Sequence, residues 1–153
     1  SGTNGTSGTN GASGTSGISG TSGISGTSGT SMSNVRTFGI VIDGGGSVIT
    51  PGEKTDVVIP YNMRIEEWVL VADQKGYIRI DMWKTDYANF PPDASDSITA
   101  GSPPEIPLGS AKNADVVPVG WTSLINTGDI IRFNVGSVVD ITKVTLSLKG
   151  TLL

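Results

Sequence analysis

Glycine occupies every third position from Gly2 to Gly29 and no other position in that stretch. The ten glycines in this register are Gly2, Gly5, Gly8, Gly11, Gly14, Gly17, Gly20, Gly23, Gly26 and Gly29. A flexible linker of glycine, serine and threonine has no need for such a register. The crowded axis of a collagen triple helix, by contrast, admits only glycine at every third residue. The spacing therefore predicts a triple-helical stalk of three chains, with a linker or another close packing of glycines as the alternatives.

The repeat lacks the residue on which collagen normally depends, because its triplets contain no proline. Each residue then loses about 1–2 kcal/mol of backbone conformational entropy on ordering, with no help from a ring that pre-sets the backbone. Such a stalk is weak alone and needs a trimeric domain to hold three chains together at high effective concentration. Ser1 falls in the third position of a triplet, which predicts that the repeat continues upstream.

The chain divides at about residue 34 into a stalk (1–34) and a head (35–153). In the head, runs of Val, Ile, Thr and aromatic residues alternate with Gly, Pro, Asn and Asp, which is the pattern of short β-strands. No stretch shows a convincing helical period. Seven to nine short strands in a region of this length indicate an all-β head, a β-sandwich of jelly-roll or related Greek-key type.

Two stretches show the alternation of a strand with one buried face. The first is residues 77–84, in which Ile78, Ile80 and Met82 share a face, and the second is residues 141–150, with Val144, Leu146 and Leu148 inward. The sequence "DQKG" at residues 73–76 predicts a turn that separates residues 77–84 from the apolar run before it. Residues 85–115 hold five prolines and break the rhythm, which predicts one long connection of the kind that often carries function.

The composition excludes several kinds of chemistry. Cysteine and histidine are both absent, so thiolate nucleophiles, histidine bases and zinc sites built on these ligands cannot occur. The net charge is −4, with no charged residue before Arg36 and no basic run, which argues against nucleic acid and anionic membranes as partners. No apolar run is long enough to span a bilayer, so membrane insertion is not expected. No cofactor is indicated.

Paired carboxylates are the remaining route to catalysis or metal binding. Asp81 with Asp86, or Glu66 with Glu67, could serve glycosidase chemistry in principle, although adjacent residues of a regular strand point to opposite faces. The loop aspartates Asp93 and Asp96 match no known calcium-loop signature. Such pairs are common on solvated strand edges, and we expect neither an enzyme nor a metal site.

A cluster of aromatic and polar residues begins at the end of the strand over residues 77–84. Its members are Trp83, Asp86, Tyr87, Asn89 and Phe90. Aromatic faces flanked by amide and carboxylate groups suit sugar recognition, so these five residues are the candidate ligand-binding site. The alternative is that the three aromatic side chains pack in the core or in a trimer interface. Trp68 and Trp121 are expected in the core.

The head resembles a known family in several short motifs. These are "ADQKG" (72–76), "DMWKTDYANFPP" (81–92), "DSIT" (96–99), "GWTS" (120–123) and "GDIIRFNV" (128–135). Over roughly residues 46–149 they resemble a β domain that recurs at the carboxyl ends of tailed-phage tail-fibre and related virion proteins, where it often follows Gly-X-Y repeats. The resemblance implies a trimeric fibre module that contacts a host surface, and it brings no catalytic residues. Bacterial and spore-surface filaments are similar in architecture only.

The sequence thus predicts a homotrimeric structural and adhesive fibre protein, on a virion or outside the cell. Its expected partners are its own copies, upstream fibre or virion components, and a host-surface glycan or protein. We expect recognition at the end of the head away from the stalk and on the outer flank. The alternatives are a bacterial surface or extracellular filament protein and a carbohydrate-binding module on a Gly/Ser/Thr linker.

Overall fold

Seven antiparallel strands make up the part of the chain that the structure, a computed structural model, describes: residues 33–153. The strands are β1 (Val35–Asp43), β2 (Gly52–Val58), β3 (Met63–Thr85), β4 (Glu105–Val116), β5 (Leu124–Ile125), β6 (Ile130–Val139) and β7 (Lys143–Leu152), and one 3-10 turn, η4 (Ala94–Asp96), lies between β3 and β4. The all-β prediction is confirmed. The repeat glycines from Gly2 to Gly29, predicted to form a triple-helix axis, lie outside the described residues.

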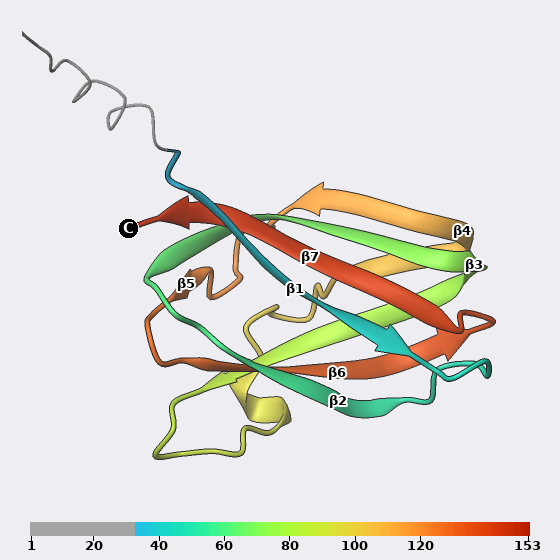
Figure 1. Ribbon diagram of the computed structural model, residues 1–153, viewed down its shortest axis with the longest axis horizontal. Helices are drawn as coiled ribbons and strands as arrows, with labels where there is room; N and C mark the ends of the chain where they lie inside the picture. Colours follow the sequence, from blue (N-terminus) through green and yellow to red (C-terminus); the bar gives the residue numbers. More distant parts are fainter. Residues whose placement is uncertain (1–32) are drawn as a thin grey trace, which may run out of the picture. The chain divides into compact units, whose positions relative to one another are not determined.

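The strands form one curled sheet in the order β1-β7-β3-β6-β2, and β4 and β5 also pair with β3 (Figure 1). β3 belongs to both halves of this sheet because it bends midway. Its residues 63–72 pair with β7, whereas its residues 77–85 pair with β6. β4 follows the same bend along the edge of β3. The fold is therefore sandwich-like, as the sequence predicts.

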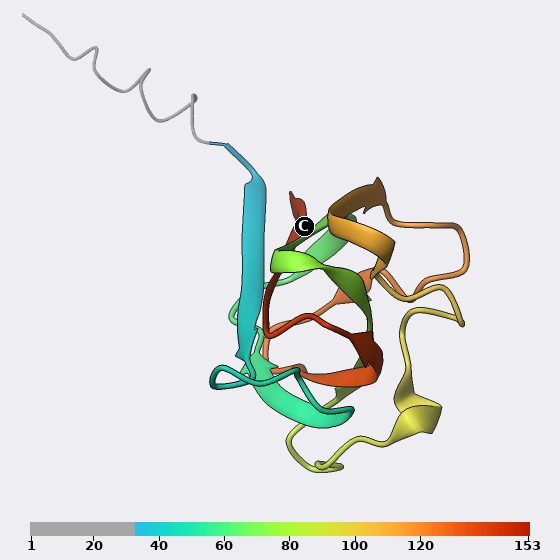
Figure 2. The ribbon, with the colours of Figure 1, turned by 90° about the vertical axis from the view of Figure 1, so that its right-hand side faces the viewer.

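We call the two halves the first and second half-sheets. The first contains β1, β7, residues 63–72 of β3 and residues 112–116 of β4. The second contains β2, β6, residues 77–85 of β3 and residues 105–110 of β4. Seen from one end, the strands curl around a single apolar core (Figure 2).

The core confirms the predicted alternation. Ile78, Ile80 and Met82 are each 0% exposed, and they project inward from the second half-sheet. The inward residues of β7, which are Val144, Leu146 and Leu148, are likewise buried. Trp68 and Trp121 lie in the same cluster, as predicted.

The predicted turn at residues 73–76 is wrong, because β3 continues through it. Its pairing with β4 shifts register between Val71 and Gly76, where the strand crosses from the first half-sheet to the second. A Cβ at Gly76 would lie 2.1 Å from the carbonyl oxygen of Val139. The glycine that suggested a turn is therefore required by the close approach of β6 to the bend.

The long connection predicted over residues 85–115 is too long, because β4 begins at Glu105. The strand escaped the sequence pattern because it contains Pro107 and its apolar residues do not alternate regularly with polar ones. It lies at the edge of the sheet, where it pairs with β3 alone. A proline is tolerated on an edge strand, since its missing N–H can face solvent.

Candidate functional site

The segment predicted to bind a ligand leaves β3 at Thr85, which pairs with Ile130 at the start of β6. Val58, at the end of β2, pairs with the same Ile130, and a short loop leads from it to the first residue of β3. Residues 86–96 therefore begin at the end of the β unit where β1 also begins (Figure 1). The predicted location of recognition, at the end of the head away from the stalk, stays a prediction, because the stalk lies outside the described residues.

Trp83 is the member of the predicted site that lies deepest. It is 7% exposed, and its indole Nε1 donates to Oδ2 of Asp81 at 2.9 Å. Little of this ring surface can reach a ligand. Its position matches the packing interpretation that the sequence left open.

Asp86, Tyr87 and Asn89 form a tight turn beyond the end of β3. Oδ1 of Asp86 accepts from both the backbone N and the side-chain Nδ2 of Asn89, each at 2.9 Å. The turn leaves the Tyr87 side chain projecting into solvent, 87% exposed. The structure thus brings two of the predicted polar groups together and presents one predicted aromatic ring next to them.

Phe90 is held against the second half-sheet by a cation that the sequence reasoning missed. Cζ of Arg132 lies 5.0 Å from the centroid of the Phe90 ring. The Arg132 guanidinium also donates to both carboxylate oxygens of Asp56, at 2.8 and 2.9 Å. This hydrogen-bonded pair, with a weaker contribution from Glu53, raises the pKa of Arg132 above its ordinary value. A single arginine on the polar face of a strand gave no signal, because its partners become visible only once β2 pairs with β6.

We expect Tyr87 and Asn89 to contribute to binding rather than to stability. Replacing both with alanine should abolish any retention on an array of neutral glycans, since the exposed ring and its neighbouring amide would be lost. The melting temperature should stay within about 2 °C of wild type, because surface substitutions away from packed features change stability little. The measurement is array binding beside a thermal melt. A large drop in melting temperature would show instead that these side chains pack in the fold.

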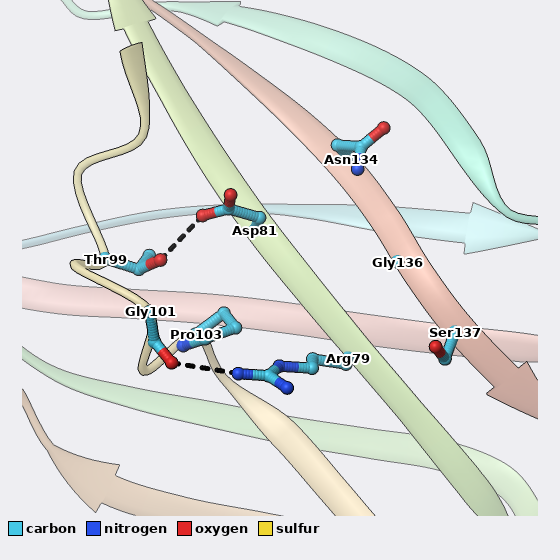
Figure 3. Close-up of a pocket in the computed structure, with 8 residues that line it drawn as sticks. All are labelled: Arg79, Asp81, Thr99, Gly101, Pro103, Asn134, Gly136 and Ser137. Atoms are coloured by element: carbon cyan, nitrogen blue, oxygen red, sulfur yellow. Dashed lines mark hydrogen bonds between the residues drawn. The ribbon is translucent and has the colours of Figure 1, made fainter. Parts of the chain in front are cut away.

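A hollow of about 320 Å³ lies on the outer face of the second half-sheet (Figure 3). β3 and β6 form its floor, and residues 99–103 form one wall. Nη2 of Arg79 donates to the carbonyl oxygen of Gly101 at 2.9 Å, which ties the wall to the floor. Asn134 and Ser137 add polar groups from β6 to the lining. The hollow can receive a polar group of a ligand.

Asp81, in the same hollow, organises the wall. Its Oδ1 accepts from the backbone N of Met82 at 2.8 Å and from the hydroxyls of Ser97 at 2.8 Å and Thr99 at 2.6 Å. Its Oδ2 accepts from the indole of Trp83. With four donors around it, this carboxylate serves to fix residues 97–99 against β3.

The other carboxylates that the sequence raised for catalysis are also engaged. Glu67 forms an ion pair with Lys149 at 3.0 Å, and Glu66 accepts from the Thr151 hydroxyl at 3.0 Å. Both partners lie on the outward side of β7. The expectation that Glu66 and Glu67 point to opposite faces is therefore wrong, because a register shift between Ile65 and Glu67 interrupts the alternation of the strand.

Asp93 and Asp96 cap the short turn η4. The Asp93 carboxylate accepts from the backbone N of Ser95, and the Asp96 carboxylate accepts from the backbone N of Asp93. The hydrogen bond from the Ser95 hydroxyl lowers the pKa of Asp93 below its ordinary value of 3.8. Within residues 33–153, no three His, Cys, Asp or Glu side chains are grouped so as to hold a metal ion.

Compared with known proteins, the chain matches no family model, no curated protein and no solved structure. In the described part of the chain, no helix is long and apolar enough to cross a membrane.

Proposed function

We propose that this chain is a structural and adhesive fibre protein of the tail-fibre type. Three copies wind their Gly-X-Y repeats into a collagen-like stalk, and the jelly-roll-like β unit of residues 35–153 holds the three chains together. The assembly belongs on a virion or a cell surface, where its upstream part joins other fibre components. The flank of the β unit contacts a host-surface glycan or protein.

The observation that carries this proposal is the uninterrupted glycine register from Gly2 to Gly29. Only a packing in which every third residue lies at a crowded axis requires glycine there, and the collagen triple helix is such a packing. The first strand, β1, begins six residues after the last of these glycines. The repeat is therefore joined to a folded unit by a short connection, as a stalk is joined to the domain that trimerises it.

The adhesive part of the proposal is supported by what the β unit exposes. Tyr87 is 87% exposed and Phe90 is 43% exposed, beside the Asp86–Asn89 turn. Such rings can pack on the apolar face of a sugar or on a protein. The chain carries a net charge of −4, so an uncharged glycan or a polar protein surface suits it better than an anionic polymer.

The test of the proposal is the mass of the assembly in solution, measured by sedimentation at micromolar protein concentration. We expect the full chain to sediment as a trimer. We also expect residues 35–153 alone to form a trimer, because proline-free triplets are too weak to lead assembly. A monomeric full chain would contradict the proposal. If the full chain is a trimer but the β unit alone is a monomer, the repeat, and not the β unit, drives trimer formation.

A carbohydrate-binding module on a flexible linker is the second candidate function. The exposed Tyr87 ring beside Asp86 and Asn89 favours it. The two candidates differ in stoichiometry, because a module on a linker is a monomer. The same sedimentation measurement therefore separates them.

A further inference from the structure

The outward side of the first half-sheet carries a patch of small and apolar side chains. Four valines stand out on it: Val41 on β1, Val69 and Val71 on β3, and Val116 on β4 are 60%, 42%, 46% and 63% exposed. We call this surface the valine face. Single exposed valines are ordinary on a protein surface, but several in neighbouring strands of one sheet form a contiguous patch, which marks an interaction site.

The strand registers show that the valines are contiguous. Thr145 of β7 lies between Val41 and Val71, since it pairs with both. Two residues further along each strand, Ser147 lies between Gly39 and Val69. Val69 pairs in turn with Ala114. Because the side chains between the valines are small, this surface is nearly flat except where it is hollowed.

One such hollow, of about 350 Å³, opens between β3 and β4 on this side. Its apolar lining comes from Trp68, Val69, Ala114 and Val116, and the charged residues Glu67 and Asp115 complete it. A hollow of this kind can take an apolar side chain from a facing surface.

Charged side chains border the valine face, and one of them, Lys112 on the edge strand β4, pairs directly with Val71. Lys149 pairs with Glu67 at 3.0 Å, and Lys143 pairs with Asp43 at 3.9 Å. An apolar centre with a polar rim is the composition of protein–protein interfaces.

The outward side of the second half-sheet is different. It carries Arg132 with Asp56 and Glu53, and Arg79 with Glu105. Burying those groups would remove several charges from water, and the cost can exceed the gain from their mutual attraction. Of the two broad faces of the β unit, the valine face is therefore the one that can be buried at low cost.

Chain length ties this face to the axis of the proposed stalk. The six residues from Gly29 to Val35 span at most about 21 Å when fully extended. In a triple helix the three copies of Gly29 share one axis, so each Val35 must lie within that reach of it. Val35 begins β1, which forms one border of the valine face.

We propose that the valine face is the surface through which three copies of this chain pack around the threefold axis. This inference rests on the proposed function and names the interface that the proposed function requires. A cyclic interface of three copies is heterologous. The β1 side of one valine face, with Val41, therefore meets the β4 side of the next, where the hollow beside Val69 and Val116 lies.

The absence of cysteine from the whole chain allows a direct test. Single-cysteine variants Val71→Cys and Val58→Cys place one thiol on the valine face and one on β2, whose valine is 64% exposed. In the full-length protein, a polyethylene-glycol maleimide should modify the Val71→Cys thiol about tenfold or more slowly than the Val58→Cys thiol, because reagent reaches a buried thiol only when the interface opens. In denaturant the two rates should be equal. Sedimentation of each variant is measured alongside.

The outcomes separate this inference from the proposed function. Equal native rates in variants that sediment as trimers would overturn the valine face as the interface and leave the trimeric fibre standing. A monomeric wild type would overturn both.

A charge variant gives an independent readout. Val69→Lys in the full chain should raise the protein concentration needed for the trimer by about tenfold or more, because a lysine would be buried against an apolar surface. Val58→Lys should leave it unchanged, with far-UV circular dichroism showing that both variants fold. An unchanged trimer in Val69→Lys would also contradict the inference.

Discussion

Replacing Asp81 with alanine is expected to lower the free energy of unfolding of the β unit by about 3 kcal/mol, since buried donors left without an acceptor cost roughly 1–3 kcal/mol each. The carboxylate accepts from the Ser97 and Thr99 hydroxyls and from the Trp83 indole. Thr99 is 0% exposed and Trp83 is 7% exposed, so their donors have little access to water that could replace the lost acceptor. Urea unfolding followed by tryptophan fluorescence measures the change.

Two further variants distinguish the network from a general effect of removing a surface charge. Asp81→Asn keeps one acceptor oxygen and should lose about half as much stability, since hydrogen bonds to charged groups are roughly twice as strong as neutral ones. Asp115→Ala, on the edge strand β4, removes an exposed carboxylate and should change stability by less than about 0.5 kcal/mol. Equal losses in Asp81→Ala and Asp115→Ala would contradict the role assigned to the network.

The strands of the core could be predicted because their burial is regular. Wherever apolar residues alternate, as at Ile78, Ile80 and Met82, the structure has a strand with those side chains inward. β4 and the bend of β3 could not be predicted in this way. The bend consists of polar residues and glycine, and β4 lacks a regular alternation of apolar residues. Both are extended because they pair with neighbouring strands, and a local sequence pattern does not show such pairing.

The candidate site shows the same limit at the level of side chains. The sequence alone predicts its position after the strand at residues 77–84 and shows its aromatic residues. The roles within it depend on tertiary pairings. Asp81 became a structural hub because residues 97–99 return to β3. Phe90 is held by Arg132, whose own position follows from the pairing of β6 with β2.

The Glu66–Glu67 pair shows how one irregularity changes such a prediction. Strict alternation would separate the two carboxylates, yet a register shift beside Ile65 turns both toward β7. Bulges of this kind depend on the partner strand and are not visible in the alternation of a single strand.

In the full-length protein, Gly17→Ala is expected to remove most of the triple-helical circular dichroism signal. The methyl group would lie at an axis where only glycine fits. Gly17 stands near the middle of the register that runs from Gly2 to Gly29, so the substitution divides the stalk into two short runs. Without proline in either run, each must order its backbone at about 1–2 kcal/mol per residue, and neither is long enough to recover that cost.

Thr15→Ala is the matched control, because Thr15 occupies the X position of its triplet, which faces outward in a triple helix. It should leave the signal and its melting transition nearly unchanged. If the β unit drives assembly, both variants should remain trimers. Gly17→Ala should then lose the triple-helical circular dichroism signal while it still sediments as a trimer. Equal tolerance of the two substitutions, with the full chain still trimeric, would mean that the glycine register does not form a triple helix and that the repeat acts as a spacer.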